Sequence, residues 1–210
     1  QLNAMASDDL KALTTAQVKA LTSTQLGALT STQVALMETA DIAALAPDQV
    51  NKLSSGAIAA LTSSQVRALS SAQLNALTST QLRAMKTADV AALSTAQVSQ
   101  LSAAQVALLS TAQVVGLGTA QVRALGTAQV AALTSAQLNA MATEDLQALS
   151  SAQVRALSST QVSALTTGQI VALSTAQVAA LSNTQVASLT SAQLNAMASD
   201  DLKALTTAQV

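Results

Sequence analysis

Cysteine, histidine and all aromatic residues are missing from this chain of 210 residues. Without cysteine, the protein has neither disulfides nor thiolate metal sites. Without aromatic side chains, the core must consist of Leu, Val, Met and Ala alone. One proline and six glycines leave few residues that favour sharp turns.

Charge is also scarce. Charged residues make up 9% of the chain, against roughly 25% in typical soluble proteins, and the net charge is −1. Such a chain has no basic field for nucleic acid or anionic lipid. No apolar run approaches the ~18 residues that span a bilayer. We therefore expect no nucleic-acid partner, no membrane span, and a surface of Ser, Thr, Gln and Asn.

The chain contains one eight-residue unit repeated end to end. Every eighth residue from Met5 to Leu205 is Leu or Met, and Val, Leu or Ile follows five positions later, from Leu10 to Val210. The consensus octad is L-[ST]-[ST]-x-Q-[VLI]-x-A, lettered a to h, with a at Leu13 and h at Ala20. A short period without insertions predicts a single continuous solenoid over residues 1–210.

A longer period lies above the octad. Gln1–Val18 and Gln193–Val210 are identical and lie 192 residues apart, which is 24 octads. This identity predicts that the chain is a window of a longer array with a 192-residue repeat. The alternative is a recent duplication of this stretch alone.

Capping residues predict one short helix per octad. A continuous helix would rotate the Leu positions by ~80° per octad, so no apolar stripe would survive. Position b is usually Ser or Thr and position e is almost always Gln or Asp, as in Thr22 and Gln25, which is the spacing of a capping box. The single proline, Pro47, falls at c, the first helical residue, where proline is favoured. We expect a helix from about c to a, with b as the joint.

On this phasing, positions f, h and a form the inward face, as in Val18, Ala20 and Leu21. Capping already accounts for Gln at e, and ladders of glutamines between successive octads are the alternative role of this position. The predicted fold is an all-α solenoid of very short helices. A β-solenoid is the alternative, because Thr and Val favour strands. Its odd spacings between a and f would place Leu and Val on opposite faces.

Two resemblances accompany this pattern. The run from Leu45 to Val50, LAPDQV, resembles the helix-opening segment of TAL-effector repeats. This resemblance supports the helix start but gives no reason to expect DNA binding. The chain as a whole resembles the octapeptide-repeat tracts of very large bacterial cell-surface or adhesin-like proteins.

Five octads depart from the consensus together. Each has Met at a and Asp at e, and no other octad has either residue at these positions: Met5/Asp9, Met37/Asp41, Met85/Asp89, Met141/Asp145 and Met197/Asp201. They are either duplicated variants or candidate lateral or turn-to-turn contacts. Single carboxylates on separate helices supply too few oxygens for a metal site, so we expect no metal and no cofactor.

The other polar rows have simpler interpretations. Lys and Arg gather at g, for example Lys19 and Arg67, where we expect a solvated face, with inter-turn ion pairs to Asp as the alternative. Ser and Thr at b and c act as caps and joints. No residue set suggests a positioned acid, base or nucleophile, so we expect no enzyme.

The sequence therefore predicts a structural protein. The leading hypothesis is a segment of a long extracellular stalk, fibre or tube, with the chain itself as partner through end-to-end continuation or lateral self-assembly, and with attachment to a cell surface. The alternatives are an adhesin-type binding module on a bacterial surface and an ice-binding protein that uses its Thr rows.

Overall fold

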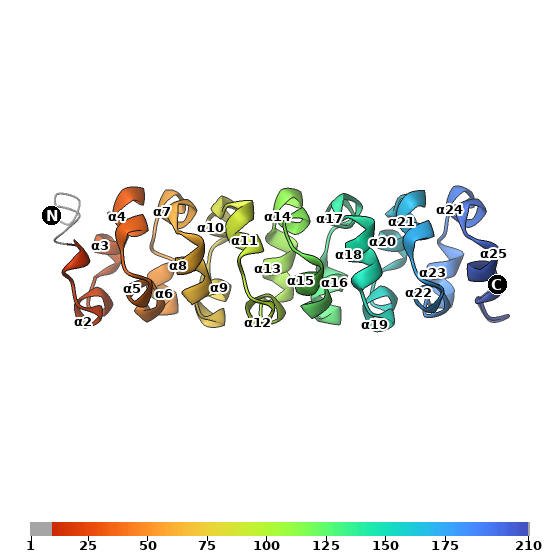
Figure 1. Cartoon of the computed structure of the whole chain (residues 1–210), viewed down its shortest axis with the longest axis horizontal. Coiled ribbons are helices and arrows are strands. Elements are labelled where there is room, and N and C mark those ends of the chain that lie inside the picture. Colours follow the sequence, from red (N-terminus) through yellow and green to blue (C-terminus); the bar gives the residue numbers. More distant parts are fainter. Residues whose placement is uncertain (1–9, 210) are drawn as a thin grey trace. The chain divides into compact units, whose positions relative to one another are not determined.

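The computed structural model describes residues 10–209 and contains no strand within them. Its contacts divide the chain into two units, Gln1–Leu109 and Ser110–Val210. Both consist of short helices joined in tandem (Figure 1). The all-α solenoid is confirmed, and the β-solenoid alternative is wrong. No helix among the described residues is long and apolar enough to cross a membrane.

Each described helix belongs to one octad. The helices of the first unit are α2 (Thr15–Lys19), α3 (Ser23–Gly27), α4 (Ser31–Leu36), α5 (Thr39–Ala44), α6 (Pro47–Val50), α7 (Ser55–Ala60), α8 (Ser63–Ala68), α9 (Ser71–Ala76), α10 (Ser79–Ala84), α11 (Thr87–Ala91), α12 (Thr95–Ser99) and α13 (Ala103–Leu108).

The second unit repeats the same element. Its helices are α14 (Thr111–Val115), α15 (Thr119–Ala124), α16 (Thr127–Ala132), α17 (Ser135–Ala140), α18 (Thr143–Ala148), α19 (Ser151–Arg155), α20 (Ser159–Ala164), α21 (Thr167–Ala172), α22 (Thr175–Ala179), α23 (Asn183–Ala187), α24 (Ser191–Ala196) and α25 (Ser199–Lys203).

The capping box starts these helices, as the sequence predicts. At α8, Thr62 Oγ1 accepts a hydrogen bond from Gln65 N (3.2 Å), and Gln65 Oε1 accepts one from Thr62 N (2.8 Å). Two of the N–H groups that a helix leaves unpaired at its start are thereby satisfied. Pro47 is the first residue of α6, where its missing N–H costs nothing.

The joint between helices is longer than the sequence indicates. Most helices end at h and some at g, and none of the described helices reaches a. After α8, Leu69 is extended (φ −63°, ψ 132°), and the next cap, Ser70, is extended as well (φ −71°, ψ 159°). The described residues include no positive φ. Two extended residues therefore redirect the chain, which explains why so few glycines suffice.

The inward face also differs from the prediction. Positions f and a are buried as expected, with Val66 0% and Leu69 2% exposed. The h alanines are mostly half-buried, whereas the e glutamines are buried in most octads, with Gln65 only 2% exposed. The prediction of f, h and a is wrong at h, because e points inward in its place.

The buried glutamine joins one turn of the solenoid to the next. Gln65 Nε2 in α8 donates to the carbonyls of Val34 and Met37 at the end of α4, both at 2.9 Å. These partners lie 31 and 28 residues earlier. Helices also pack on the helix three places further along within a unit, as α4 does on α7 and α15 on α18. One superhelical turn therefore takes between three and four octads.

This bridge recurs in both units. In the second unit, Gln177 Nε2 donates to the carbonyls of Leu146 (2.9 Å), Gln147 (3.3 Å) and Leu149 (2.7 Å) at the end of α18. Its Oε1 accepts from Ser174 N at 2.8 Å. One side chain thus caps its own helix and satisfies the unpaired carbonyls at the end of another.

Replacing a bridging glutamine by leucine should cost far more than removing a cap alone. Gln177→Leu roughly keeps side-chain volume but removes the amide donor from the carbonyls of Gln147 and Leu149, so we expect the free energy of unfolding to fall by about 2–4 kcal/mol. The control is Gln17→Leu, because Gln17 is exposed and its bonds to residues that the structure describes all belong to its capping box. That change should cost about 1 kcal/mol. Urea unfolding followed by far-UV circular dichroism measures both, and equal losses would contradict the bridge.

Candidate functional site: the Met/Asp octads and the exposed rows

The aspartates of the Met/Asp octads lie at the third position of their helices and are buried. Asp41 and Asp89 are 3% exposed, and Asp145 and Asp201 are 8% exposed. Their methionine companions also lie in the core: Met37, Met85, Met141 and Met197. Met5 and Asp9 lie outside the described residues.

Each of these four carboxylates accepts a hydrogen bond from a hydroxyl on the preceding turn, 26 residues earlier. The pairs are Thr15 Oγ1 to Asp41 Oδ1 (3.1 Å), Ser63 Oγ to Asp89 Oδ1 (2.9 Å), Thr119 Oγ1 to Asp145 Oδ1 (3.0 Å) and Thr175 Oγ1 to Asp201 Oδ1 (2.8 Å). The donors occupy position c of the helix three places earlier. Glutamine, by contrast, reaches the helix four places earlier.

The Met/Asp octads also lack the usual cap. Their described N-cap residues are Glu38, Lys86, Ala142 and Ala198, and none accepts a side-chain cap bond. A carboxylate is shorter than the glutamine amide and has no N–H, so it cannot donate to carbonyls on another turn. In these octads, one hydroxyl–carboxylate bond therefore replaces the bonds that a glutamine amide makes to its own helix start and to the carbonyls of another turn. The described contacts do not explain why Met accompanies Asp.

The four described aspartates stay apart from one another. Asp145 and Asp201 are separated by 56 residues, twice the 28-residue offset of the glutamine bridge, so they lie on the same side of the second unit two turns apart. Within residues 10–209, no group of three or more acidic side chains is placed to hold a metal ion. Asp89 Oδ2 is buried without a hydrogen-bond partner.

The g row is more than a solvated face. Arg67 Nε donates to Ala92 O (3.0 Å) and Arg83 Nε to Leu108 O (3.1 Å), each 25 residues further on. Asn75 donates to Gln100 O (2.8 Å) and accepts from the N–H of Ser102 (2.7 Å). These long polar side chains tie adjacent turns of the first unit together. The sequence feature that could have indicated these bonds between turns is a long side chain with an N–H donor at position g.

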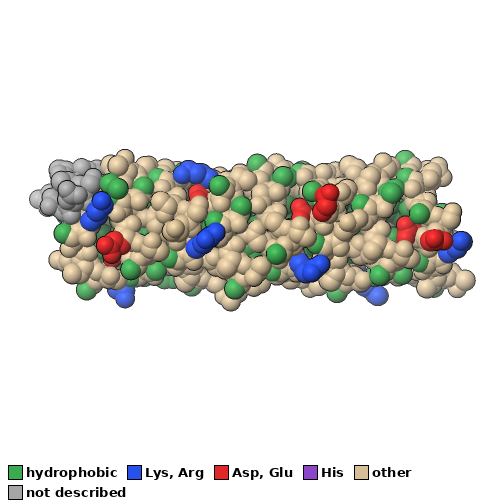
Figure 2. All heavy atoms as spheres, viewed as in Figure 1, with side chains coloured by type: hydrophobic (Ala, Val, Ile, Leu, Met, Phe, Trp, Pro, Cys, Tyr) green, Lys and Arg blue, Asp and Glu red, His purple; other side chains and the backbone are tan. Residues whose placement is uncertain are grey.

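Ion pairs contribute little to the described part of the chain. Its one ion pair joins Lys203 to Asp200 at 3.2 Å, and both side chains are largely exposed. Exposed pairs of this kind add at most about 1 kcal/mol. Charged side chains cover only small parts of the face shown in Figure 2. The alternative of inter-turn pairs between g cations and the e aspartates is therefore wrong for these residues.

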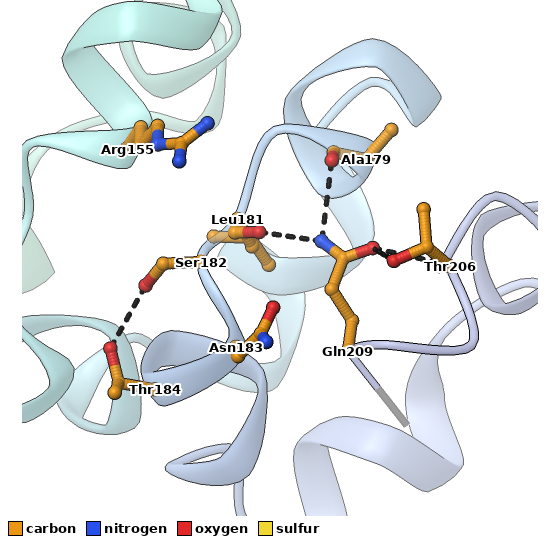
Figure 3. Close-up of a pocket in the computed structure, with 8 residues that line it drawn as sticks. All are labelled: Arg155, Ala179, Leu181, Ser182, Asn183, Thr184, Thr206 and Gln209. Atoms are coloured by element: carbon orange, nitrogen blue, oxygen red, sulfur yellow. Dashed lines mark hydrogen bonds between the residues drawn. The ribbon is translucent and has the colours of Figure 1, made fainter.

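A shallow hollow in the second unit shows how the turns meet at the surface (Figure 3). Gln209 Nε2 donates to Ala179 O (3.3 Å) and Leu181 O (2.5 Å) beneath it. Arg155 and Ser182 also line it, and Arg155 is the one ionisable residue among the eight that do so. A second hollow, in the first unit, is lined mainly by the same octad positions, around Gln49. The hollows are features of the repeat.

Fold and contacts define an all-α repeat protein in which short helices, one per octad, are joined to neighbouring turns by recurring side-chain contacts. The chain belongs to the ALTTAQ repeat family, whose repeat matches residues 2–37, 34–71, 58–87, 82–119, 115–143, 138–175 and 167–199. No curated protein matches the chain. The family match names neither TAL effectors nor bacterial adhesins.

Removing the hydroxyl that binds an aspartate should weaken the turn-to-turn contact. Thr119→Val leaves the buried carboxylate of Asp145 without its partner, so we expect the free energy of unfolding to fall by about 1.5–3 kcal/mol. Thr127→Val is the matched control, since the residue 26 positions after Thr127 is Gln153 rather than Asp. It should change stability by less than about 0.5 kcal/mol. Similar losses in urea unfolding would show that the hydroxyl–carboxylate bond is not special.

Proposed function

We propose that this protein is a structural spacer, a segment of a long stalk, fibre or tube held outside a bacterial cell and attached to its surface. One observation carries the proposal: the same glutamine bridge between turns recurs in both units. Gln65 and Gln177, in different units, reach the ends of helices four places earlier with the same 28- and 31-residue offsets. An array built this way grows by whole turns without needing any new kind of interface.

The surface chemistry supports an extracellular setting. Lys and Arg number nine and aromatic residues are absent, so proteases that cut after these residues find few sites. The chain has no cysteine to oxidise. With 9% charged residues, it depends little on ionic strength, because screening acts on charge pairs. The proposed role is mechanical and non-catalytic.

The exposed rows favour a spacer over a specific adhesin. Position d is mostly Ala, Thr or Ser along the whole chain, so the rows repeat nearly the same surface. A site for one ligand would instead concentrate unusual residues in one place.

Inserting whole superhelical turns should lengthen the particle by constant steps. Residues 133–188 form seven octads, twice the 28-residue offset of the bridge, so one or two extra copies placed after Ser188 preserve the phase. We expect equal increments in maximum dimension by small-angle X-ray scattering, with helical content per residue unchanged.

The control for this experiment is an insert of identical composition in which the octad order is scrambled. It should add disordered chain and lower the helical content per residue. Extra octads that collapse onto the existing chain, without lengthening it, would overturn the spacer proposal.

A further inference from the structure

Two valines stand out on the surface of the second unit. Val115 and Val171 are each 49% exposed, and with Leu202 they are the exposed large hydrophobic residues of the described chain. Both occupy position g, where no other octad has valine. They lie 56 residues apart, which is twice the 28-residue bridge offset. The two side chains therefore lie on the same side of the unit, two turns apart.

The residues between them on successive turns can be located from observed contacts. A g residue lies beside the b residue 27 positions later in the first unit, where Ser102 N donates to Asn75 Oδ1. In the second unit, two pairs with the same offset, Arg155 with Ser182 and Ala179 with Thr206, line one hollow (Figure 3).

The offset places Ala142 beside Val115 and Ala198 beside Val171. The remaining step, from Ala142 to Val171, is 29 residues, one more than the 28-residue offset of the bridge, and a c and an h residue, Ser159 and Ser188, are in contact at this separation. Val115, Ala142, Val171 and Ala198 therefore form one column over successive turns, which we term the apolar strip. All four are exposed.

The two alanines of the apolar strip stand where a capping residue is usual. Position b is otherwise Ser, Thr or Gly in most octads, and α18 and α25 have lost their side-chain caps because b is Ala142 and Ala198. Losing such a cap costs roughly 1 kcal/mol. An isolated exposed valine needs no explanation. Four apolar substitutions aligned on one side of one unit point to a covered surface.

We propose that the apolar strip pairs with the same strip of a second copy of this chain, running antiparallel. Along the strip, large and small residues alternate from Val115 to Ala198. Under a two-fold axis, Val115 faces Ala198 of the second copy, and Ala142 faces Val171 of the second copy. Each large side chain then meets a small one, as an isologous interface requires.

The acidic side chains beside the apolar strip favour the same antiparallel orientation. The exposed acids Glu144 and Asp200 follow Ala142 and Ala198 by two residues. In a parallel pair, Glu144 would face its own counterpart, which is unfavourable, whereas Asp200 is already paired with Lys203. In the antiparallel pair, the acids face turns that present valine. The antiparallel pair extends the proposed structural role. The pairing and the spacer role can fail separately, because a monomeric chain could still act as a spacer.

Sedimentation equilibrium of the whole chain tests the pairing. A strip four turns long is smaller than a standard interface, so we expect a weak dimer populated above about 100 µM. V115R/V171R should weaken association at least tenfold. The matched control is A131R/A187R, two exposed g alanines that are also 56 residues apart but in another column. It should leave association within twofold. A wild-type chain that stays monomeric, or equal effects of both variants, would overturn the proposal.

Cross-linking tests the orientation. Because the chain has no cysteine, single V115C and A198C variants can be mixed and oxidised. We expect disulfide-linked heterodimers between residues 115 and 198, identified by mass spectrometry, at least tenfold faster than homodimers of either variant. Homodimers of V115C that form as fast as the heterodimer would show a parallel or unspecific encounter and refute the antiparallel strip.

Discussion

The glutamine amide at position e is the contact on which the rest of the structure depends. A helix of five or six residues leaves most of its backbone groups unpaired at its ends. Gln177 satisfies a donor at the start of its own helix and acceptors at the end of α18. Burying it costs little because both ends of the amide are paired. Helices too short to be stable alone thereby become parts of a continuous array.

Bridging confines most variation to positions that neither the bridge nor the capping box uses. Positions e, f and a carry the core and b caps the helix, so d and g can differ between octads. At position g, Arg67 donates a hydrogen bond to the next turn, whereas Val115 exposes an apolar side chain. The Met/Asp octads exchange the bridge for another contact, and the octad of α7 lacks the amide because Ala57 stands at e. Asp145 still joins its helix to the preceding turn, but through a hydroxyl.

Local rules predicted the helix starts, because a capping box involves residues only three positions apart. Thr62 and Gln65 pair as their spacing indicates, and Pro47 opens its helix. The helix ends were placed too late, since the sequence does not show that Leu69 leaves the helix to extend the joint. Ala at h was assigned to the core on helical spacing alone, and the longer reach of the bridging glutamine places e there instead. The roles of Arg67 and Asn75 were missed because their partners lie 25 to 27 residues away.

The amino-acid sequence specifies the octad: its start signal, its aliphatic core, and its lack of aromatic, thiol or imidazole chemistry. Which octads meet depends on the tertiary structure, because the length of a superhelical turn follows from how helices pack and not from any local preference. That length, between three and four octads, brings Asp145 to Thr119 and aligns Val115 with Val171. The eight-residue period defines the octad, and the packing of successive turns determines which octads are in contact.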